Sequence, residues 1–468
     1  MKSFYITTTL PYVNAEPHIG FAMELIHADI ITRYKEMQGF DVYFNTGTDE
    51  HGLKIYQAAL REGKTPQSYT DGLAQKFKNL QPLLGLHRDL HFIRTTDEHH
   101  KKVAQEFWRL CEKAGDIYKK EYKIRYCVGC ELEKTDSELV GGRCPIHPNR
   151  ELEIIEEDNY FFRLSKYGPN LLEFYDENPN FVVPDSRLNE MRALIDRGLE
   201  DFSISRLKSK MPWGIDVPGD PDHVQYVWFD ALVNYISTIG WPDDMEKFNK
   251  YWPVVQFAGK DQVRQQVVMW QAMLMSAGLP PSQQIVIHGF VNYEGQKMSK
   301  SLGNVISPQE IIDEYGLDAL RYFVAREFNQ FEDTDISREK LKTAYNANLA
   351  NGLGNLVARV MKLAESNLDV PIGQSRALTI QGELKEALDR FEIQKAMNHI
   401  WQEIGDLDLL IQGKKPWKSK DKKIIKDLVE DLGQIAHNLK PFMPETAEKI
   451  LKAIKENKKP ENLFPRKD

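Results

Sequence analysis

The N-terminal segment alternates between two patterns that together restrict the fold strongly. An apolar, β-branched run over residues 3–9 is followed, after a proline-containing turn, by apolar residues at helical spacing over 18–38. Gly39 then precedes a second apolar run over residues 42–45. A strand, a helix and a strand in this order form a βαβ unit, in which the two strands are parallel. The sequence therefore predicts an α/β domain with ligands at the carboxyl ends of its strands.

Two further apolar runs, over residues 254–258 and 285–287, enclose a helical pattern over 265–277. Because this repeats the alternation of the N-terminal segment, we expect the same parallel sheet to resume here. The charged stretch 116–210 between the two halves is therefore predicted to be an insertion. From about residue 336 onward apolar residues recur only at helical spacing, which indicates an appended helical bundle.

These patterns predict four parts. They are the first half of a Rossmann-type domain (1–115), a connective insertion (116–210), the second half of that domain (211–335) and an α-helical bundle (336–468). A chain of 468 residues is too long for a single compact core, so several units are expected. The lysine-rich residues after Ile454 are expected to fray.

The composition is that of an ordinary globular protein, with 41% apolar and 28% charged residues and no long uninterrupted apolar run. Because strand-like residues begin almost at the N-terminus, a signal peptide has no room, and we expect a cytoplasmic protein without membrane contact. Acidic residues exceed basic ones by 69 − 61 = 8, which argues on average against a polyanionic partner. The lysine-rich tract 414–423 can still bind nucleic acid locally, although such tracts are more often solvated helix faces.

Three of the four cysteines fall into two close ligand pairs. Cys127 and Cys130 form the first pair, and Cys144 and His147 form the second after the intervening residues 131–143. Sulfur and nitrogen ligands in this spacing predict one tetrahedral Zn²⁺ site, and Gly129 supplies a turn of the kind that such knuckles need. Four protein ligands leave no open position, so the zinc is expected to be structural. Buried cysteines without a metal are the less favoured alternative.

Two short motifs indicate that the chain uses ATP. The loop Lys297-Met298-Ser299-Lys300-Ser301 alternates lysines with hydroxyl residues, as suits a mobile basic loop that grips a triphosphate. His18 and Gly20 lie where the first strand gives way to the first helix, and free backbone N–H groups there favour anions. A single histidine at a helix start is more often a cap or a packing residue, so the pairing with the lysine loop carries the interpretation.

These two motifs resemble the HIGH and KMSKS signatures of class I aminoacyl-tRNA synthetases. Within that class the chain is similar, over nearly its whole length, to the methionyl-tRNA synthetases. Besides the cysteine–histidine pairs, the similarity rests on TLPYVN at residues 9–14, TGTDEHG at 46–52, VWFDA at 227–231 and GKD at 259–261. The resemblance implies that methionine is activated with ATP to methionyl-adenylate and transferred to the 3′ end of tRNA(Met).

The resemblance also implies where methionine and ATP bind. An aliphatic and aromatic pocket would surround the methionine thioether, and a carboxylate would pair with the methionine ammonium group. The residues implied to bind methionine are Leu10, Tyr12, Asp49, Trp228, Ala231, Tyr235, Gln262 and Gln266. ATP with its Mg²⁺ would bind at His18, Gly20, Phe21, Lys297 and Lys300, of which His18 and the two lysines are the catalytic residues. Without the resemblance, Trp228 and Tyr235 would be taken as core residues and Asp49 as a helix cap.

In the helical bundle the resemblance implies three residues that read the anticodon. Asn355 and Arg359 lie one turn apart on a helical pattern, and Trp417 offers a plane on which a base can stack. Each of them would otherwise be taken as a solvent-facing helix residue or a loop anchor. No appended domain follows the bundle, so the resemblance favours a monomer.

The chain departs from the family pattern at a few positions. Phe21 replaces the second histidine of the HIGH signature and is expected to stack on adenine or to pack beneath it. Gln262 and Gln266 occupy positions where many family members have an aliphatic residue and a histidine, and Gln266 cannot become cationic. Two other hypotheses are a HIGH-type nucleotidyltransferase and a catalytically silent tRNA-binding paralogue. The zinc insertion and the helical bundle argue against the first, and the intact Lys297 and Asp49 argue against the second.

Overall fold

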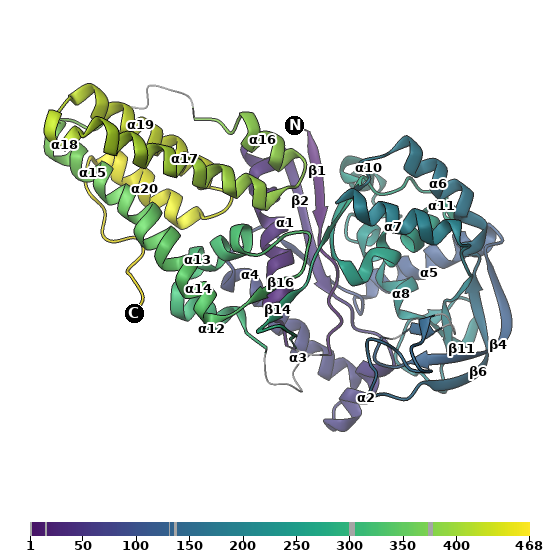
Figure 1. The fold of residues 1–468 in the computed structure, drawn as a ribbon. Coiled ribbons are helices and arrows are strands. Elements are labelled where there is room, and N and C mark those ends of the chain that lie inside the picture. Colours follow the sequence, from purple (N-terminus) through teal and green to yellow (C-terminus); the bar gives the residue numbers. More distant parts are fainter. Residues whose placement is uncertain (1, 15, 131, 135–137, 299–304, 373–377) are drawn as a thin grey trace. The chain divides into compact units, whose positions relative to one another are not determined.

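The structure is a computed structural model that describes residues 2–14, 16–130, 132–134, 138–298, 305–372 and 378–468. The chain forms two compact units (Figure 1). The first unit comprises residues 1–17, 41–81 and 88–287, and the second comprises residues 18–40, 82–87 and 288–468. The first helix, although it connects two strands of the first unit, therefore belongs to the second unit.

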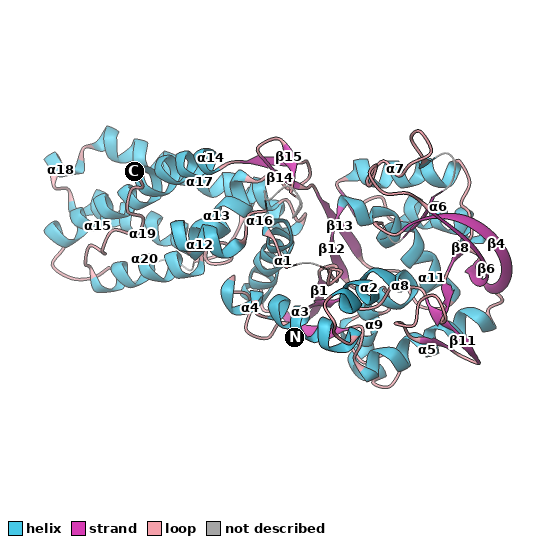
Figure 2. Ribbon diagram, turned by 90° about the horizontal axis from the view of Figure 1, so that it is seen from below, coloured by secondary structure: helices cyan, strands magenta, loops and turns pink. Residues whose placement is uncertain are grey.

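The first unit contains the predicted parallel sheet (Figure 2). Its strand order is β3-β2-β1-β12-β13-β7. The strands are β1 (Ser3–Thr7), β2 (Asp41–Thr48), β3 (His91–Arg94), β7 (Val182–Val183), β12 (Val255–Gly259) and β13 (Gln284–His288). β1 pairs in parallel with both β2 and β12. The prediction that one parallel sheet is split by a long insertion is confirmed, and the insertion itself adds the edge strand β7.

Besides the parallel sheet, the first unit contains helices and two antiparallel sheets. Its helices are α2 (Leu53–Arg61), α3 (Pro66–Lys78), α5 (Glu98–Lys113), α6 (Gly168–Glu177), α7 (Asp185–Asp196), α8 (Val227–Ala231), α9 (Asn234–Ser237), α10 (Met245–Tyr251) and α11 (Trp270–Ser276). The insertion also forms the antiparallel strands β4 (Ile117–Cys127), β5 (Leu132–Lys134), β6 (Glu153–Phe162) and β8 (Phe202–Ser203). A small antiparallel sheet consists of β9 (Ser205–Leu207), β10 (Asp216–Val217) and β11 (Asp220–Gln225).

The second unit is mainly helical, as the pattern after residue 336 predicts. It contains α1 (Ile19–Met37), α12 (Pro308–Tyr315), α13 (Leu317–Tyr322), α14 (Arg338–Ala344), α15 (Asn355–Asn367), α16 (Gly382–Asp389), α17 (Ile393–Lys414), α18 (Pro416–Ser419), α19 (Lys422–Leu439) and α20 (Pro444–Glu456). The short helix α4 (Leu80–Leu83) begins in the first unit and ends in the second. A three-stranded sheet is formed by β14 (Val291–Tyr293), β15 (Gln296–Lys297) and β16 (Thr334–Ile336). Helices α15, α17 and α20 each lie beside α19 (Figure 1).

Helix α1 is buried on more faces than its sequence pattern predicts. Buried polar residues interrupt its apolar face, and three of them, Glu24, His27 and Asp29, have partners in other elements of the second unit. Asp29 pairs with the fully buried Arg321 at 2.7 Å, and the Arg321 guanidinium also donates to the carbonyls of Pro441 and Phe442. Because an unpaired buried charge is costly, these bonds fix α1 firmly within its unit.

The expectation that the chain frays after Ile454 is wrong. Helix α20 continues to Glu456, and the following segment returns to the bundle. Phe464 is buried against the ring of Tyr345, with ring centroids 6.1 Å apart. The side chain of Asn346 holds the backbone of Lys467 through two hydrogen bonds of 2.8 and 2.9 Å. The buried Phe464 and the hydrogen bonds to Lys467 therefore keep the C-terminal segment packed on the bundle, although its composition is lysine-rich.

In the part of the chain that the structure describes, no helix is both long and apolar enough to cross a membrane.

Candidate active site and metal centre

Asp49 follows β2 at the carboxyl end of the central sheet. Its backbone N–H donates to the Pro11 carbonyl (3.0 Å), and its own carbonyl accepts from Val13 (3.1 Å). These bonds create a parallel bridge between Asp49 and Tyr12. The segment that contains Leu10 and Tyr12 is thus fastened alongside Asp49. Two parts of the predicted methionine site, which are far apart in the sequence, therefore lie next to each other.

The next residue, Glu50, holds this loop in place from inside the protein. Its fully buried carboxylate accepts two hydrogen bonds from Arg94, at 2.7 and 2.8 Å. The hydroxyls of Thr48 and Thr96 donate to the same carboxylate at 2.6 and 2.5 Å. A carboxylate with this many donors is fixed in position, so the backbone that bears Asp49 is rigid.

His51 links the same loop to helix α8. Its Nδ1 lies 3.0 Å from Oδ2 of Asp230, and both side chains are buried. Burial raises the pKa of Asp230, whereas the neighbouring His51 opposes that rise. Trp213 packs on the His51 ring, with centroids 5.5 Å apart, and its indole N–H donates to the Glu50 carbonyl at 2.5 Å. The loop is therefore tied to the helix that carries Trp228 and Ala231.

Aromatic side chains gather beside α8. Trp228 and Tyr12 both pack against a small core cluster of Tyr126, Tyr226 and Val227. Trp228 also packs against the main core of the unit, which includes the buried Tyr235. The structure therefore brings the predicted aromatic residues of the methionine site into one region.

Gln266 lies in a π-helical turn (Arg264–Met269) and is buried. Its Nε2 donates to the Tyr235 hydroxyl at 2.8 Å, and its Oε1 accepts from Gln256 Nε2 at 2.9 Å. Gln262 ends the preceding 3₁₀ turn and is only partly buried. Gln266 is thus coupled directly to Tyr235, whereas Gln262 lies nearer the surface.

The nucleotide motifs belong to the second unit. His18 is the N-cap of α1, and its Nδ1 accepts the Gly20 N–H at 3.1 Å. A Cβ on residue 20 would lie 3.1 Å from the imidazole ring, so a glycine leaves the ring room to cover the helix terminus. Phe21 is partly buried in the first turn. His18 therefore caps helix α1, which is the alternative role that the sequence allows for a single histidine at a helix start.

The KMSKS motif follows a tight hairpin. β14 and β15 pair antiparallel, with Asn292 opposite Lys297, and the turn between them contains Gly295 at φ 74°. The Gly295 N–H donates to Asp335 Oδ1 at 2.6 Å, and Lys340 binds the other carboxylate oxygen of Asp335 at 2.8 Å. The backbone of Lys297 is therefore held by the three-stranded sheet.

The remainder of this motif cannot be placed, since Lys300 and its neighbours 299–304 lie outside the described residues. Beyond them the chain returns to the HIGH motif, because the Ile19 N–H donates to the Ile306 carbonyl at 3.2 Å. The two nucleotide motifs are thus linked within a single unit.

The three predicted anticodon residues line one groove of about 630 Å³ in the helical bundle. Asn355 is exposed, Arg359 is partly buried and the Trp417 side chain is 45% exposed. Arg359 Nη1 lies 2.5 Å from Asp408 Oδ1. The groove is also lined by Lys420, which belongs to the lysine-rich tract 414–423, and by Lys362 and Lys459, which the sequence did not single out. A basic groove with an exposed indole suits an unstacked nucleic-acid base.

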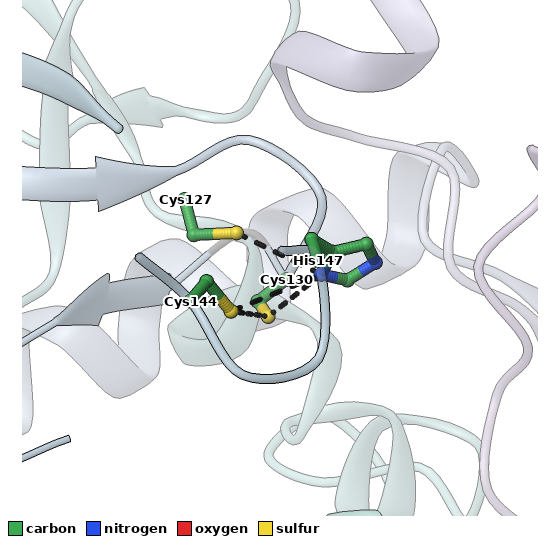
Figure 3. A group of neighbouring side chains, drawn as sticks. All are labelled: Cys127, Cys130, Cys144 and His147. Atoms are coloured by element: carbon green, nitrogen blue, oxygen red, sulfur yellow. Dashed lines mark hydrogen bonds between the residues drawn. The ribbon is translucent and has the colours of Figure 1, made fainter. Parts of the chain in front are cut away.

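The four predicted metal ligands converge in the insertion (Figure 3). Their donor atoms all lie within 4.8 Å of one another. Cys130 Sγ is 3.4 Å from Cys144 Sγ and 3.2 Å from His147 Nδ1, and Cys127 Sγ is 3.7 Å from His147 Nδ1. A tetrahedral site with ordinary Zn–S and Zn–N bonds needs separations of about 3.5–3.8 Å. The residues therefore fit a single metal ion.

The local backbone explains why this cluster closes. The N–H of Cys130 donates to the Cys127 carbonyl, and that of His147 donates to the Cys144 carbonyl, both at 3.1 Å. A Cβ on Gly129 would lie 2.6 Å from the His147 ring, so only a glycine lets the ring approach. Each ligand pair is thus a tight turn, and the cluster could hold a metal ion.

The sequence motifs did not reveal the residues that support the predicted methionine site. Glu50 and His51 lie inside the TGTDEHG motif, but their partners Arg94 and Asp230 are 44 and 179 residues away along the chain. The only sequence signal for these pairs was that Glu50 and His51 are ionisable residues within a motif. Gln256 was missed as well, because a glutamine in an apolar strand pattern carries no local signature.

Comparison with known proteins shows which family the chain resembles in sequence. A family model described as "tRNA synthetases class I (M)" matches residues 4–153 and 147–361. A methionine–tRNA ligase from Thermotoga maritima is 42% identical over 481 residues, which cover 98% of this chain and 76% of that protein. One from Caldanaerobacter subterraneus is 41% identical, with 97% of this chain and 74% of that protein covered.

The fold agrees as well. The solved structure of Mycobacterium tuberculosis methionyl-tRNA synthetase in complex with methionyl-adenylate superposes with a TM-score of 0.90 at 37% sequence identity. The match covers 96% of this chain and 93% of that one. An agreement of sequence and fold over nearly the whole chain leaves no support for a HIGH-type nucleotidyltransferase. The chain belongs to the class I aminoacyl-tRNA synthetases, in the methionyl-tRNA synthetase family.

Proposed function

We propose that the chain is a methionine–tRNA ligase, which activates methionine with ATP and transfers it to the 3′ end of tRNA(Met). The observation that carries this proposal is the full-length similarity to a methionyl-tRNA synthetase whose structure contains methionyl-adenylate. The coexistence of both nucleotide motifs with a cluster of buried and partly buried aromatic residues in this chain supports it further.

Methionine binds in the first unit. Leu10, Tyr12 and Trp228, together with Ala231 and Tyr235, supply apolar and aromatic surface for the thioether side chain. Asp49, which is 5% exposed, pairs with the ammonium group. Gln262 lies at the edge of the site and Gln266 lies behind Tyr235. The rigid attachment of Asp49 through Glu50 and His51 supports this assignment, because a fixed carboxylate loses little entropy on binding.

ATP binds in the second unit at His18, Gly20 and Phe21, and Lys297 and Lys300 contact its phosphates. The methionine carboxylate oxygen attacks the α-phosphorus, pyrophosphate leaves with its electron pair, and methionyl-adenylate remains bound. The enzyme needs no protein nucleophile, since positioning and charge stabilisation provide the acceleration. Mg²⁺ enters with the nucleotide and is coordinated mainly by phosphate oxygens.

The tRNA anticodon binds in the groove formed by Asn355, Arg359 and Trp417. An amide and a guanidinium one helical turn apart can bind the edges of unstacked bases, while the indole stacks on a third. Lys420 and Lys459 in the same groove contact phosphates. The salt bridge from Asp408 to Arg359 favours this role, because it orients the guanidinium before the RNA arrives.

The metal ion is Zn²⁺, held by Cys127, Cys130, Cys144 and His147. Three thiolates and one imidazole are a ligand set that zinc prefers, and four protein ligands make the site structural. We retain the four predicted parts, 1–115, 116–210, 211–335 and 336–468, as the functional division of the chain. A monomeric enzyme that acts in the cytoplasm completes the proposal.

Charging of tRNA tests this function. The purified chain with ATP and Mg²⁺ is expected to attach labelled methionine to a transcript of tRNA(Met) with a CAU anticodon. The same transcript with an unrelated anticodon serves as the control and is expected to be charged far more slowly. Methionine activation without any charging would contradict the tRNA part of the proposal, and a complete lack of both would identify a silent paralogue.

A further inference from the structure

Two buried glutamines and Tyr235, a residue of the proposed methionine site, form a chain of hydrogen bonds. Gln256, on strand β12, donates through Nε2 to Gln266 Oε1 at 2.9 Å. Gln266 donates in turn through its own Nε2 to the Tyr235 hydroxyl at 2.8 Å. All three side chains are at most 2% exposed. Each bond therefore lies away from water, where its direction matters energetically.

Gln256 makes no other side-chain hydrogen bond in the described part of the chain. Its Oε1 is buried without a hydrogen-bond partner, although the side chain is fully enclosed. Burying an amide that satisfies one of its two polar groups destabilises a fold, and an apolar residue of this size would pack there at lower cost. Because Gln256 hydrogen-bonds only Gln266 in the described part of the chain, its role is best explained by its effect on the orientation of the Gln266 amide.

The partner is fixed on its other side. The Gln266 carbonyl accepts from Gln271 Nε2 at 2.8 Å, and the Tyr235 carbonyl accepts from the Tyr5 hydroxyl at 2.9 Å. These bonds hold the backbones of both residues without involving their side-chain polar groups. The Gln256 N–H faces Gln266 Oε1, and with that oxygen occupied the other end of the Gln266 amide, its N–H, faces Tyr235.

This direction has a chemical consequence for the ligand. A hydroxyl that accepts from Gln266 points its own hydrogen away from Gln266. The sulfur of a thioether accepts a hydrogen bond weakly and donates none. A tyrosine whose hydrogen was instead committed to Gln266 would offer the sulfur only lone pairs. The observed direction therefore suits a thioether, and the opposite direction does not.

We propose that Gln256 is a positioning residue for methionine specificity, which orients Gln266 so that the Tyr235 hydroxyl donates to the ligand sulfur. Gln256 does not touch the substrate in this scheme and acts only through Gln266. The inference rests on the proposed function, because it presumes that Tyr235 faces the methionine side chain.

The test compares methionine with norleucine, which has a methylene group in place of the sulfur. The ratio of kcat/KM values for the two amino acids in ATP–pyrophosphate exchange isolates the hydrogen bond to sulfur. Gln256→Glu in its ionised form removes the donor and can only accept, so Gln266 must reverse its amide. This variant is expected to lower the methionine-to-norleucine ratio about fivefold to tenfold, with the KM for ATP unchanged.

Two further variants keep the test decisive if the buried carboxylate prevents folding. Gln256→Leu removes the donor without adding charge and is expected to lower the ratio about threefold. Gln256→His restores an N–H donor and is expected to keep the wild-type ratio. Gln271→Leu is the matched control, since it removes a buried glutamine that hydrogen-bonds the Gln266 carbonyl and the backbone N–H and hydroxyl of Ser282, and no side-chain polar group of Gln266.

The outcomes separate this inference from the proposed function. If the wild-type chain does not exchange pyrophosphate with methionine, the function itself is wrong. If it does, and folded Gln256→Leu retains the wild-type ratio, Gln256 has only a packing role. A ratio that falls equally in Gln271→Leu would likewise overturn the proposal, because the effect would then be general loosening.

Discussion

The two units differ in how they expose their predicted ligand-binding residues. In the first unit, Asp49 is 5% exposed and Tyr235 is 2% exposed, and both belong to buried hydrogen-bonded networks. In the second unit, His18 is exposed and the Trp417 side chain is 45% exposed. A small apolar substrate offers few polar groups, so its selection needs an enclosed and fixed pocket. A triphosphate and an RNA carry many charges and can be bound at open surfaces.

The largest effect is expected where charge develops in the reaction. Lys300→Ala should lower the rate of pyrophosphate exchange roughly 100-fold or more, because the lysine stabilises the leaving phosphates chiefly in the transition state. The KM for methionine should stay nearly constant, since the residues predicted to bind methionine lie in the other unit. Steady-state kinetics at several methionine concentrations check this. A change confined to the KM for methionine would show that the two units are not functionally separate.

The converse substitution in the first unit is Asp49→Asn, which keeps the shape and removes the charge. The kcat/KM for methionine should fall about 10- to 100-fold, as expected when a charged hydrogen bond to an ammonium is lost. The KM for ATP should be unaffected, and measuring it in the same assay provides the control. A variant with altered ATP binding and normal methionine binding would reverse the assignment of the two units.

Within the second unit, anticodon binding should be separable from chemistry. Trp417→Ala should weaken tRNA binding by about 1–3 kcal/mol if a base stacks on the indole. Arg359→Ala should relax the preference for a CAU anticodon. Neither should alter pyrophosphate exchange measured without tRNA. If Trp417→Ala reduced exchange and charging equally, Trp417 would be a folding residue.

The smallest effect on activation is expected from the metal site. Cys144→Ala should abolish binding of one zinc ion per chain, as measured by elemental analysis, and perturb the insertion without abolishing ATP binding. Cys111→Ala is the matched control. Burial raises the pKa of the Cys111 thiol to about 12, which keeps it from forming the thiolate that a metal requires. Loss of zinc from Cys111→Ala, with retention by Cys144→Ala, would refute the ligand set.

The sequence predicted features that depend on local spacing. The strand, helix and strand at the N-terminus and the split parallel sheet are confirmed, because their periodicity lies within short windows. The four metal ligands converge as their spacing indicated, since each pair needs only a tight turn. Edge strand β7 was missed because two residues give no pattern.

Features that depend on distant partners escaped prediction. Helix α1 carries buried polar residues, such as Asp29, that would normally argue for a solvent-facing side. The partner of Asp29, Arg321, is 292 residues away, and nothing in either segment signals the pairing. The same holds for Glu50, whose partner Arg94 is 44 residues away and which holds the loop that bears Asp49. The motifs predict which residues bind ligands, and that remains a prediction, whereas the residues that hold them in place required the structure.

The central claim is that this chain activates methionine, and ATP–pyrophosphate exchange without tRNA tests it most directly. The full-length chain, labelled pyrophosphate, ATP and Mg²⁺ are incubated separately with methionine, leucine and valine. The account predicts exchange with methionine that exceeds the background without amino acid, and none above background with the other two. Exchange with leucine or valine but not with methionine would contradict it.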